Sequence, residues 1–249
     1  MAITFVGGRK SRPHPDAMTL IEHLTDLRRC LVISAIAFVV AAATAATLYS
    51  PILHFLLRPL CASDHGHCAL YVTSPLDGLS LRLKVAMFGG LLLSSPVILW
   101  QVWRFITPGL VAREKRFAVP FVAASVLLFI AGSATAYLTL THALKFLRAV
   151  GGPDLHAIYD PISYLGLILL MMTLFGLTFE FPVVLVSLEL AHVVTPRTLL
   201  GWWRWAIIVI MLVAAVFTPS GDPLSMFALA VPLIAFYFVS IGVGKLLGR

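Results

Sequence analysis

Six stretches of this chain carry almost no charge, and this pattern limits its fold more than any other feature. Only 12% of the 249 residues are charged and 60% are apolar, whereas a soluble domain has about 25% charged and about 45–50% apolar residues. A spanning helix needs roughly 20 predominantly apolar residues. In lipid, spanning segments are helices or closed barrels, and the alternating strands of a barrel are absent from the sequence. The sequence therefore predicts an all-α membrane protein.

We expect six transmembrane helices in a single domain that covers residues 1–249. The fifth apolar run ends at the turn signal Thr218-Pro-Ser-Gly-Asp-Pro223. This run would form only about 22 Å of helix, against a hydrocarbon core of about 30 Å, so the bilayer thins there or the turn lies below the outer surface. The predicted spans are residues 30–50, 85–103, 117–142, 161–192, 203–217 and 223–244.

The basic residues are distributed unevenly over the segments between these runs. With the first segment inside, 13 of the 18 lysines and arginines fall on the inner side and 18 − 13 = 5 on the outer side. Such an excess marks the cytoplasmic side of a membrane protein. We therefore expect both termini in the cytoplasm (N-in/C-in). Residues 1–28 would form a cytoplasmic tail with a short amphipathic helix, and residues 51–84 a long extracytoplasmic loop.

The predicted outer loop contains Cys61 and Cys68, with two histidines between them. Cysteine and histidine at short spacing can bind a metal ion, but no second ligand cluster occurs on the outer side. Thiols outside the cytoplasm tend to be oxidised. The pattern favours a local disulfide over a metal site.

Glu180 interrupts the fourth apolar run and is the strongest candidate for a functional residue. A charge at the centre of a membrane helix costs at least ~2.5–3.5 kcal/mol, so it usually marks a site. Pro182 should kink the helix two residues later. An acid that reaches the inner interface is the alternative. No HExxH motif, phosphate-binding loop or Ser-His-Asp arrangement is present, so we expect no catalytic residue, metal or cofactor.

Five stretches of the sequence resemble the TatC family, the large polytopic subunit of the twin-arginine protein translocase. They occur in the order found in the family and extend over nearly all of the chain from Met18. These stretches are EHLTDLRR (22–29), SPVILWQVWRFITPGL (95–110), REKR (113–116), FGLTFEFP (175–182) and FTPSGD (217–222).

The resemblance implies a receptor in the prokaryotic cytoplasmic (inner) membrane that exports folded proteins bearing twin-arginine signal peptides. It implies single-span partners of the TatA and TatB type, the proton motive force as energy source, and self-association in a multi-copy complex. It also implies a glove-like bundle with short fifth and sixth helices. Besides these partners we expect contact with membrane lipid and none with nucleic acid. A Glu180-dependent, ion-coupled transporter of small solutes is the alternative function.

By the same resemblance, the signal peptide is bound on the inner side of the membrane. In the family the inner-loop acid binds the twin arginines, and Glu114 matches it; Asp26 matches the contributing acid of the amphipathic helix, where many members have Glu. Arg28 and Phe105 match positions that are sensitive to change. A guanidinium makes bidentate bonds to a carboxylate, which an ammonium cannot. Two acids near one inner groove would therefore favour Arg-Arg over Lys-Lys.

The resemblance also assigns residues to the membrane interior and to its outer side. Glu180 matches the acid on the concave inner wall, where we expect a polar partner from a TatA- or TatB-type helix. Thr218 and Asp222 match the outer turn next to the partner-binding fifth helix, and Pro59 matches a further sensitive position. In this chain Ser220 and Gly221 lengthen that turn.

Overall fold

The structure is a computed structural model, and it describes residues 20–63, 74–106, 118–152, 160–190 and 193–246. Within these ranges every regular element is a helix. The helices are α1 (Leu20–Thr47), α2 (Tyr49–Ser63), α3 (Asp77–Ile106), α4 (Ala118–Gly151), α5 (Pro161–Phe179), α6 (Phe181–Leu190), α7 (Pro196–Gly201), α8 (Trp203–Phe217) and α9 (Pro223–Leu246).

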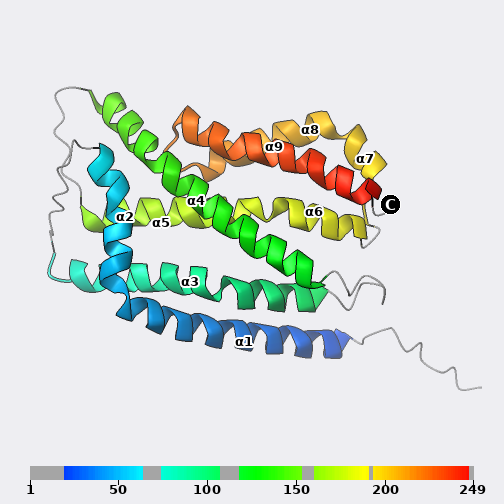
Figure 1. Cartoon of the computed structure of the whole chain (residues 1–249), viewed down its shortest axis with the longest axis horizontal. Coiled ribbons are helices and arrows are strands. Elements are labelled where there is room, and N and C mark those ends of the chain that lie inside the picture. The colour runs from blue at the N-terminus through cyan, green and yellow to red at the C-terminus, as the bar shows by residue number, and fades with distance from the viewer. Residues whose placement is uncertain (1–19, 64–73, 107–117, 153–159, 191–192, 247–249) are drawn as a thin grey trace, which may run out of the picture.

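Most of the long helices run along one common direction, α4 crosses them obliquely, and α2 lies across one end of the bundle (Figure 1). α1 packs mainly on α3, α4 on α5, and both α6 and α8 on α9. The α5–α6 pair is therefore central, with α1 and α3 on one side and α8 and α9 on the other (Figure 1). α1 begins and α9 ends at the same end of the bundle, opposite α2 (Figure 1).

Five helical segments are long and apolar enough to cross a membrane. They are Leu24–Thr47, Asp77–Phe105, Val119–Gly151, Pro161–Leu190 and Pro223–Leu246. The predicted fifth span is α8, a shorter apolar helix of only 15 residues. It therefore falls below the length of the other five, as the turn signal after it predicted.

The expectation of a short sixth helix is wrong. α9 has 24 residues, about 36 Å of helix, which is longer than the hydrocarbon core of about 30 Å. Lys245 lies in the last turn of α9. A cation at this position interacts favourably with the carbonyl end of a helix, so the helix continues past Gly244.

Two segments expected outside the spans are also helical. The amphipathic helix predicted within residues 1–28 is continuous with the first span, because no glycine or proline interrupts residues 20–47. The predicted loop 51–84 contains most of α2 and the first turns of α3. α2 forms because its apolar residues lie three or four positions apart, and Leu56 and Leu60 on that face are each 1% exposed.

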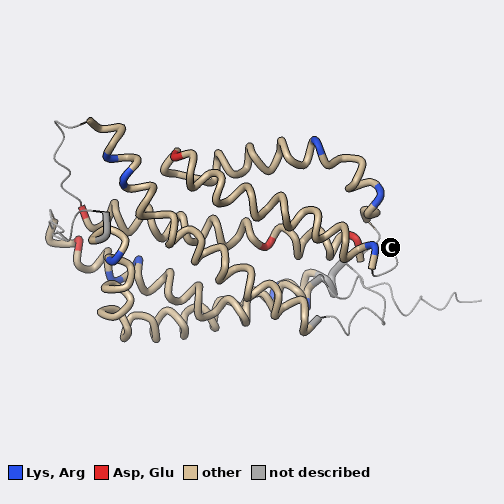
Figure 2. The backbone as a smooth tube through the Cα atoms, turned by 45° about the horizontal axis from the view of Figure 1, so that its top comes forward, with Lys and Arg blue, Asp and Glu red and all other residues tan. Residues whose placement is uncertain are grey.

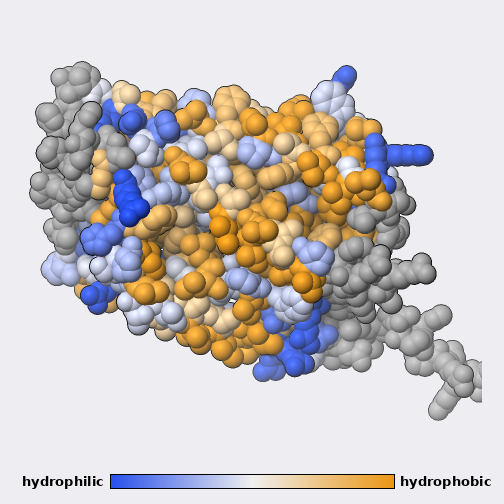
Figure 3. Space-filling model, viewed as in Figure 1, coloured by the Kyte–Doolittle hydropathy of each residue, from blue (hydrophilic) through white to orange (hydrophobic). Residues whose placement is uncertain are grey.

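The side-chain distribution is that of a protein surrounded by lipid. Lysines and arginines gather toward the two ends of the bundle (Figure 2), and apolar side chains dominate the surface between them (Figure 3). Among the described residues, six of the cations expected inside lie at the end where α1 begins, and the five expected outside lie at the α2 end. The remaining 13 − 6 = 7 inner cations lie outside the described residues, so the charge asymmetry depends on them.

Candidate functional site

The long fourth span is interrupted at Glu180. α5 ends at Phe179 and α6 begins at Phe181. Pro182 has no backbone N–H and cannot bond to the carbonyl four residues earlier. The backbone N–H of Glu180 donates instead to the Leu177 carbonyl, three residues back, at 3.1 Å. The fourth span is thus broken into two helices at Glu180, two residues before Pro182.

The carboxylate of Glu180 is only partly satisfied within the chain. The Ser125 hydroxyl of α4 donates a hydrogen bond to it. Its Oε1 is buried and has no hydrogen-bond partner among the described residues. A buried polar atom left in this way costs about 1–3 kcal/mol. One oxygen of Glu180 can therefore accept a hydrogen bond from a molecule that enters from outside.

Glu180 lines an apolar hollow between α5–α6 and α8, which we call the α8 hollow. Its volume is about 340 Å³. The other lining residues are Leu174, Leu177, Thr178, Phe181, Val184, Ala206, Val209, Ile210, Val213, Phe217 and Leu233. Glu180 is the one ionisable residue in this lining. A largely apolar hollow with a single carboxylate suits an apolar helix that carries one hydrogen-bond donor.

One face of the α5–α6 pair connects the α8 hollow to a second hollow between α1, α3 and α5. Gly166, Leu170 and Thr173 line the second hollow, while Leu177 and Val184 line the first. Residues three or four apart share a helix face, so these positions form one stripe along the fourth span. A ligand that follows this stripe would meet both hollows.

Three of the four residues expected to bind the signal peptide come together at one end of the bundle. Asp26 is half-buried and Arg28 is exposed, both near the start of α1. Phe105 is half-buried near the end of α3, which packs beside α1 at this end (Figure 1). Glu114, expected to bind the twin arginines, lies outside the described residues.

Thr218 and Asp222 shape the turn between α8 and α9. The Thr218 hydroxyl donates to the Ala214 carbonyl at 2.7 Å. Asp222 is 1% exposed. Its carboxylate accepts hydrogen bonds from the Ser225 backbone N–H and the Ser220 hydroxyl. Neither residue lines the α8 hollow, so an effect on a partner would act through the geometry of this turn.

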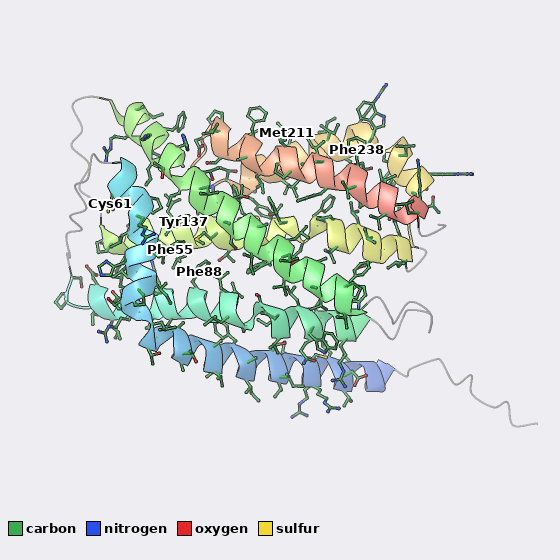
Figure 4. The ribbon with its side chains drawn as sticks, in the orientation of Figure 1. Phe55, Cys61, Phe88, Tyr137, Met211 and Phe238 are labelled. Carbon is green, nitrogen blue, oxygen red and sulfur yellow. The ribbon has the colours of Figure 1, made fainter. Side chains whose placement is uncertain are left out.

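Pro59 leaves one backbone carbonyl of α2 free to accept a hydrogen bond from a neighbouring helix. Without an N–H at residue 59, the Phe55 carbonyl has no helical donor, and the Tyr137 hydroxyl of α4 donates to it at 2.9 Å. The two rings also stack, with centroids 4.4 Å apart (Figure 4). Tyr164 of α5 donates to the neighbouring Leu56 carbonyl at 2.7 Å. The sequence reasoning missed both tyrosines, although the proline signals a free carbonyl.

Cys61, near the end of α2 (Figure 4), is disulfide-bonded, and Cys30 is free. Cys68, its expected partner, lies outside the described residues, so the pairing stays a prediction. Among the residues that the structure describes, no group of three or more potential ligands could hold a metal ion. The histidines between the two cysteines are outside that part of the chain.

Glu189 is a second buried acid, and it is absent from the residues singled out in the sequence. It lies next to the last residue of α6. It is 1% exposed, and neither carboxylate oxygen has a partner among the described residues. The carboxylate lies against Gly244 of α9, where a Cβ would collide with it. The signal was a glycine in a helix that otherwise packs with larger residues.

Comparison with known proteins agrees with the resemblance seen in the sequence. The family model of TatC, described as Sec-independent protein translocase protein, matches residues 22–232. A Sec-independent protein translocase protein TatC from Frankia casuarinae is 37% identical, over 99% of this chain and 71% of that protein. The protein of the same name from Aquifex aeolicus is 36% identical, over 93% of this chain and 97% of its own length.

The fold is shared with solved structures as well. A crystal structure of a twin arginine translocase receptor, TatC, matches with a TM-score of 0.75 and 34% identity, over 90% of this chain and 99% of that one. These matches do not favour a small-solute transporter, and they describe a component of protein transport rather than an enzyme. The chain therefore belongs to the TatC family of Sec-independent protein translocases, multi-pass membrane proteins that move other proteins across the membrane.

Proposed function

We propose that the end of the bundle with Asp26, Arg28 and Phe105 binds the twin-arginine motif of a signal peptide. The observation that carries this proposal is the position of the half-buried Asp26 beside the end of α3. Glu114 belongs to the segment that joins the end of α3 to the start of α4. Two carboxylates on these elements would each take one guanidinium in bidentate geometry.

The chemistry of such a site distinguishes arginine from lysine but does not supply all of the affinity. Exposed ion pairs contribute only ~0–1 kcal/mol each. The apolar segment of the signal peptide would add to this by lying along the stripe of α5–α6. Residues such as Leu170 and Leu177, which are 48% and 58% exposed, remain available on this face.

We propose that the α8 hollow receives a single-span helix of the TatA or TatB type. Its lining is apolar apart from Glu180 and Thr178, whose hydroxyl donates to the Leu174 carbonyl. The free Oε1 of Glu180 would accept a hydrogen bond from a polar side chain of that helix. α8 has 15 residues, so the bilayer is expected to be thin beside it. The partner's polar side chain would then meet less hydrocarbon on its way to Glu180.

The topology belongs to the same proposal. We infer six crossings, with α8 as the fifth, both termini in the cytoplasm, and the α2 end on the outer side of the inner membrane. Support comes from the start of α1 and the end of α9, which lie at one end of the bundle (Figure 1), and from the 13 to 5 distribution of basic residues. Transport would be driven by the proton motive force in a multi-copy complex.

Site-directed crosslinking of a twin-arginine signal peptide to the purified protein tests the receptor role. We expect Asp26→Ala and Glu114→Ala each to reduce crosslinking several-fold, and Asp26→Glu to retain it. Asp160→Asn is the matched control, because it removes an acid at the opposite end of the bundle. A Lys-Lys peptide should bind the wild type as weakly as the twin-arginine peptide binds the variants. Unchanged crosslinking in both alanine variants would contradict this site.

A further inference from the structure

Lys84 of α3 is the cation of a second hollow, between α1, α3 and α5, which we call the α1 hollow. It is half-buried, and its Nζ donates to the Ile162 carbonyl in the first turn of α5 at 2.9 Å. A Cβ on Gly166 would lie 3.3 Å from this Nζ. Any residue larger than glycine at position 166 would therefore crowd the Lys84 ammonium.

The rest of the α1 hollow is apolar apart from the Thr173 hydroxyl, which donates to the Leu169 carbonyl, and it faces the bilayer. Its volume is about 490 Å³. Phe88, 6% exposed, belongs to its inner wall and projects from α3 toward α5 (Figure 4). Met87 and Leu170, 59% and 48% exposed, lie at its rim. The other lining residues are Phe38, Leu91, Leu169 and Thr173.

The ammonium lies at the depth of lipid phosphates. Ile162 is the second residue of the span Pro161–Leu190, which has 30 residues, or about 45 Å of helix. This length equals a bilayer with its headgroup regions, about 40–45 Å. The end of the span at Ile162 therefore lies among the headgroups, while the α1 hollow extends from Lys84 toward the hydrocarbon.

The ammonium has donors left for a ligand. It carries three N–H donors, and the Ile162 carbonyl takes one. Asp160 interacts electrostatically with Lys84, but its carboxylate already accepts the Ser163 backbone N–H at 2.8 Å. The other described acid at the start of α3, Asp77, accepts the Ser74 backbone N–H at 2.8 Å. Both carboxylates thus serve helix starts.

We propose that the α1 hollow binds one anionic phospholipid, with an acyl chain along its apolar walls and its phosphate on the Lys84 ammonium. The lipid belongs to the leaflet at the α2 end. Charge complementarity favours an anionic headgroup, because five described cations (Arg58, Arg82, Lys84, Lys145 and Arg148) occupy this end. The phosphate site at Lys84 lies at the opposite end of the bundle from Asp26, Arg28 and Phe105, while Leu170 belongs both to the α1 hollow and to the face of α5–α6 proposed for the signal peptide.

Native mass spectrometry of the full-length protein in detergent, titrated with phosphatidylglycerol, tests the proposal. We expect one tightly held lipid per protomer in the wild type. Lys84→Ala should weaken its binding about tenfold, as for the loss of one charge-assisted hydrogen bond, and Lys84→Arg should retain it. Lys145→Ala is the control, since it removes an exposed cation at the same end of the bundle. Phosphatidylcholine, which has no net charge, should bind more weakly.

A second variant tests the hollow without touching the cation. Leu170→Trp places a large side chain at the rim and should reduce phosphatidylglycerol binding while circular dichroism shows unchanged helicity. Equal binding by wild type, Lys84→Ala and Leu170→Trp would overturn the proposal. So would a wild type that holds no lipid but forms a dimer that Lys84→Ala dissociates, because the α1 hollow would then belong to a second copy of the chain.

Discussion

The joint between α1 and α3 and the joint between α5–α6 and α8 are built in opposite ways. Gly89 and Gly90 of α3 face Ala45 and Ala42 of α1, and a Cβ on Gly90 would lie 2.8 Å from the Ala42 Cα. The two backbones therefore touch, with no space between them. At the other joint, larger apolar side chains surround a hollow of about 340 Å³ that contains the partly unsatisfied Glu180.

The difference follows from the lack of a hydrophobic driving force between helices in lipid. Helices that must stay together in a membrane do so by close packing of small residues, as α1 and α3 do. α8 instead packs mainly on α9 and leaves its other face toward α5–α6 open. We infer that the first joint is permanent and that the second is completed by a partner.

The largest effect on stability should come from a larger residue at Gly90, where the backbones of α1 and α3 touch. Gly90→Leu puts a side chain where the Ala42 backbone lies, and Gly90→Ala should already cost about 1–3 kcal/mol, the range for overpacking. Gly78→Ala on the same helix meets nothing within 4 Å and should be neutral or stabilise α3 by up to about 1 kcal/mol. Thermal unfolding in detergent measures both. Equal melting temperatures for the Gly78 and Gly90 alanine variants would show that the joint is not close-packed.

Filling the α8 hollow should leave the fold intact and remove the partner. Val213 lines the hollow, so Val213→Trp should reduce crosslinking to a TatA- or TatB-type helix several-fold, with little change in melting temperature. Ile208→Trp is the matched control on α8, because Ile208 is 58% exposed and does not line the hollow. If Ile208→Trp loses the partner and Val213→Trp keeps it, the partner binds the outer face of α8.

The outer helix α2 offers a third kind of joint, made by hydrogen bonds to carbonyls. Tyr137→Phe keeps the stacked ring but loses the 2.9 Å bond to the Phe55 carbonyl, at a cost of about 0.5–1.5 kcal/mol. Pro59→Ala supplies an N–H that can take this carbonyl instead. In the Pro59→Ala background the cost of Tyr137→Phe should therefore shrink, which a double-mutant cycle measures. An unchanged cost would mean that Pro59 does not control this bond.

Prolines and turn-forming residues made some of the helix ends predictable from the sequence. The turn signal from Thr218 gave the end of α8, and Pro182 gave the break at Glu180. The continuity of the amphipathic helix with the first span and the existence of α2 were missed, because charge was read as the end of a span although helices continue through charged residues. Apolar periodicity at Leu56 and Leu60 was the better guide to α2.

Tertiary contacts made the rest inaccessible to that reasoning. Tyr137 and Tyr164 bind carbonyls that lie 82 and 108 residues away in sequence, and no local pattern connects them. The burial of Glu189 depends on Gly244 of another helix. The predicted spans 30–50 and 85–103 did put Asp26, Arg28 and Phe105 on one side, because two crossings separate the segment before the first span from the segment after the second.

The smallest effect concerns Asp160, which begins α5 next to the α1 hollow. Its carboxylate accepts the Ser163 backbone N–H at 2.8 Å. This bond, with further contributions from the Ser163 hydroxyl and the Lys84 charge, lowers the pKa of Asp160 below its ordinary value of 3.8. A carboxyl whose pKa is lowered by folding stabilises the protein above its ordinary pKa, and this contribution disappears as the pH falls through the lower, folded value. Asp160→Asn keeps an acceptor oxygen but cannot titrate. The stability of this variant should therefore fall less than that of the wild type as the pH drops below about 4. Unfolding curves at pH 3 to 7 would reveal this difference, and parallel curves for the two proteins would show that the start of α5 does not depend on this charge.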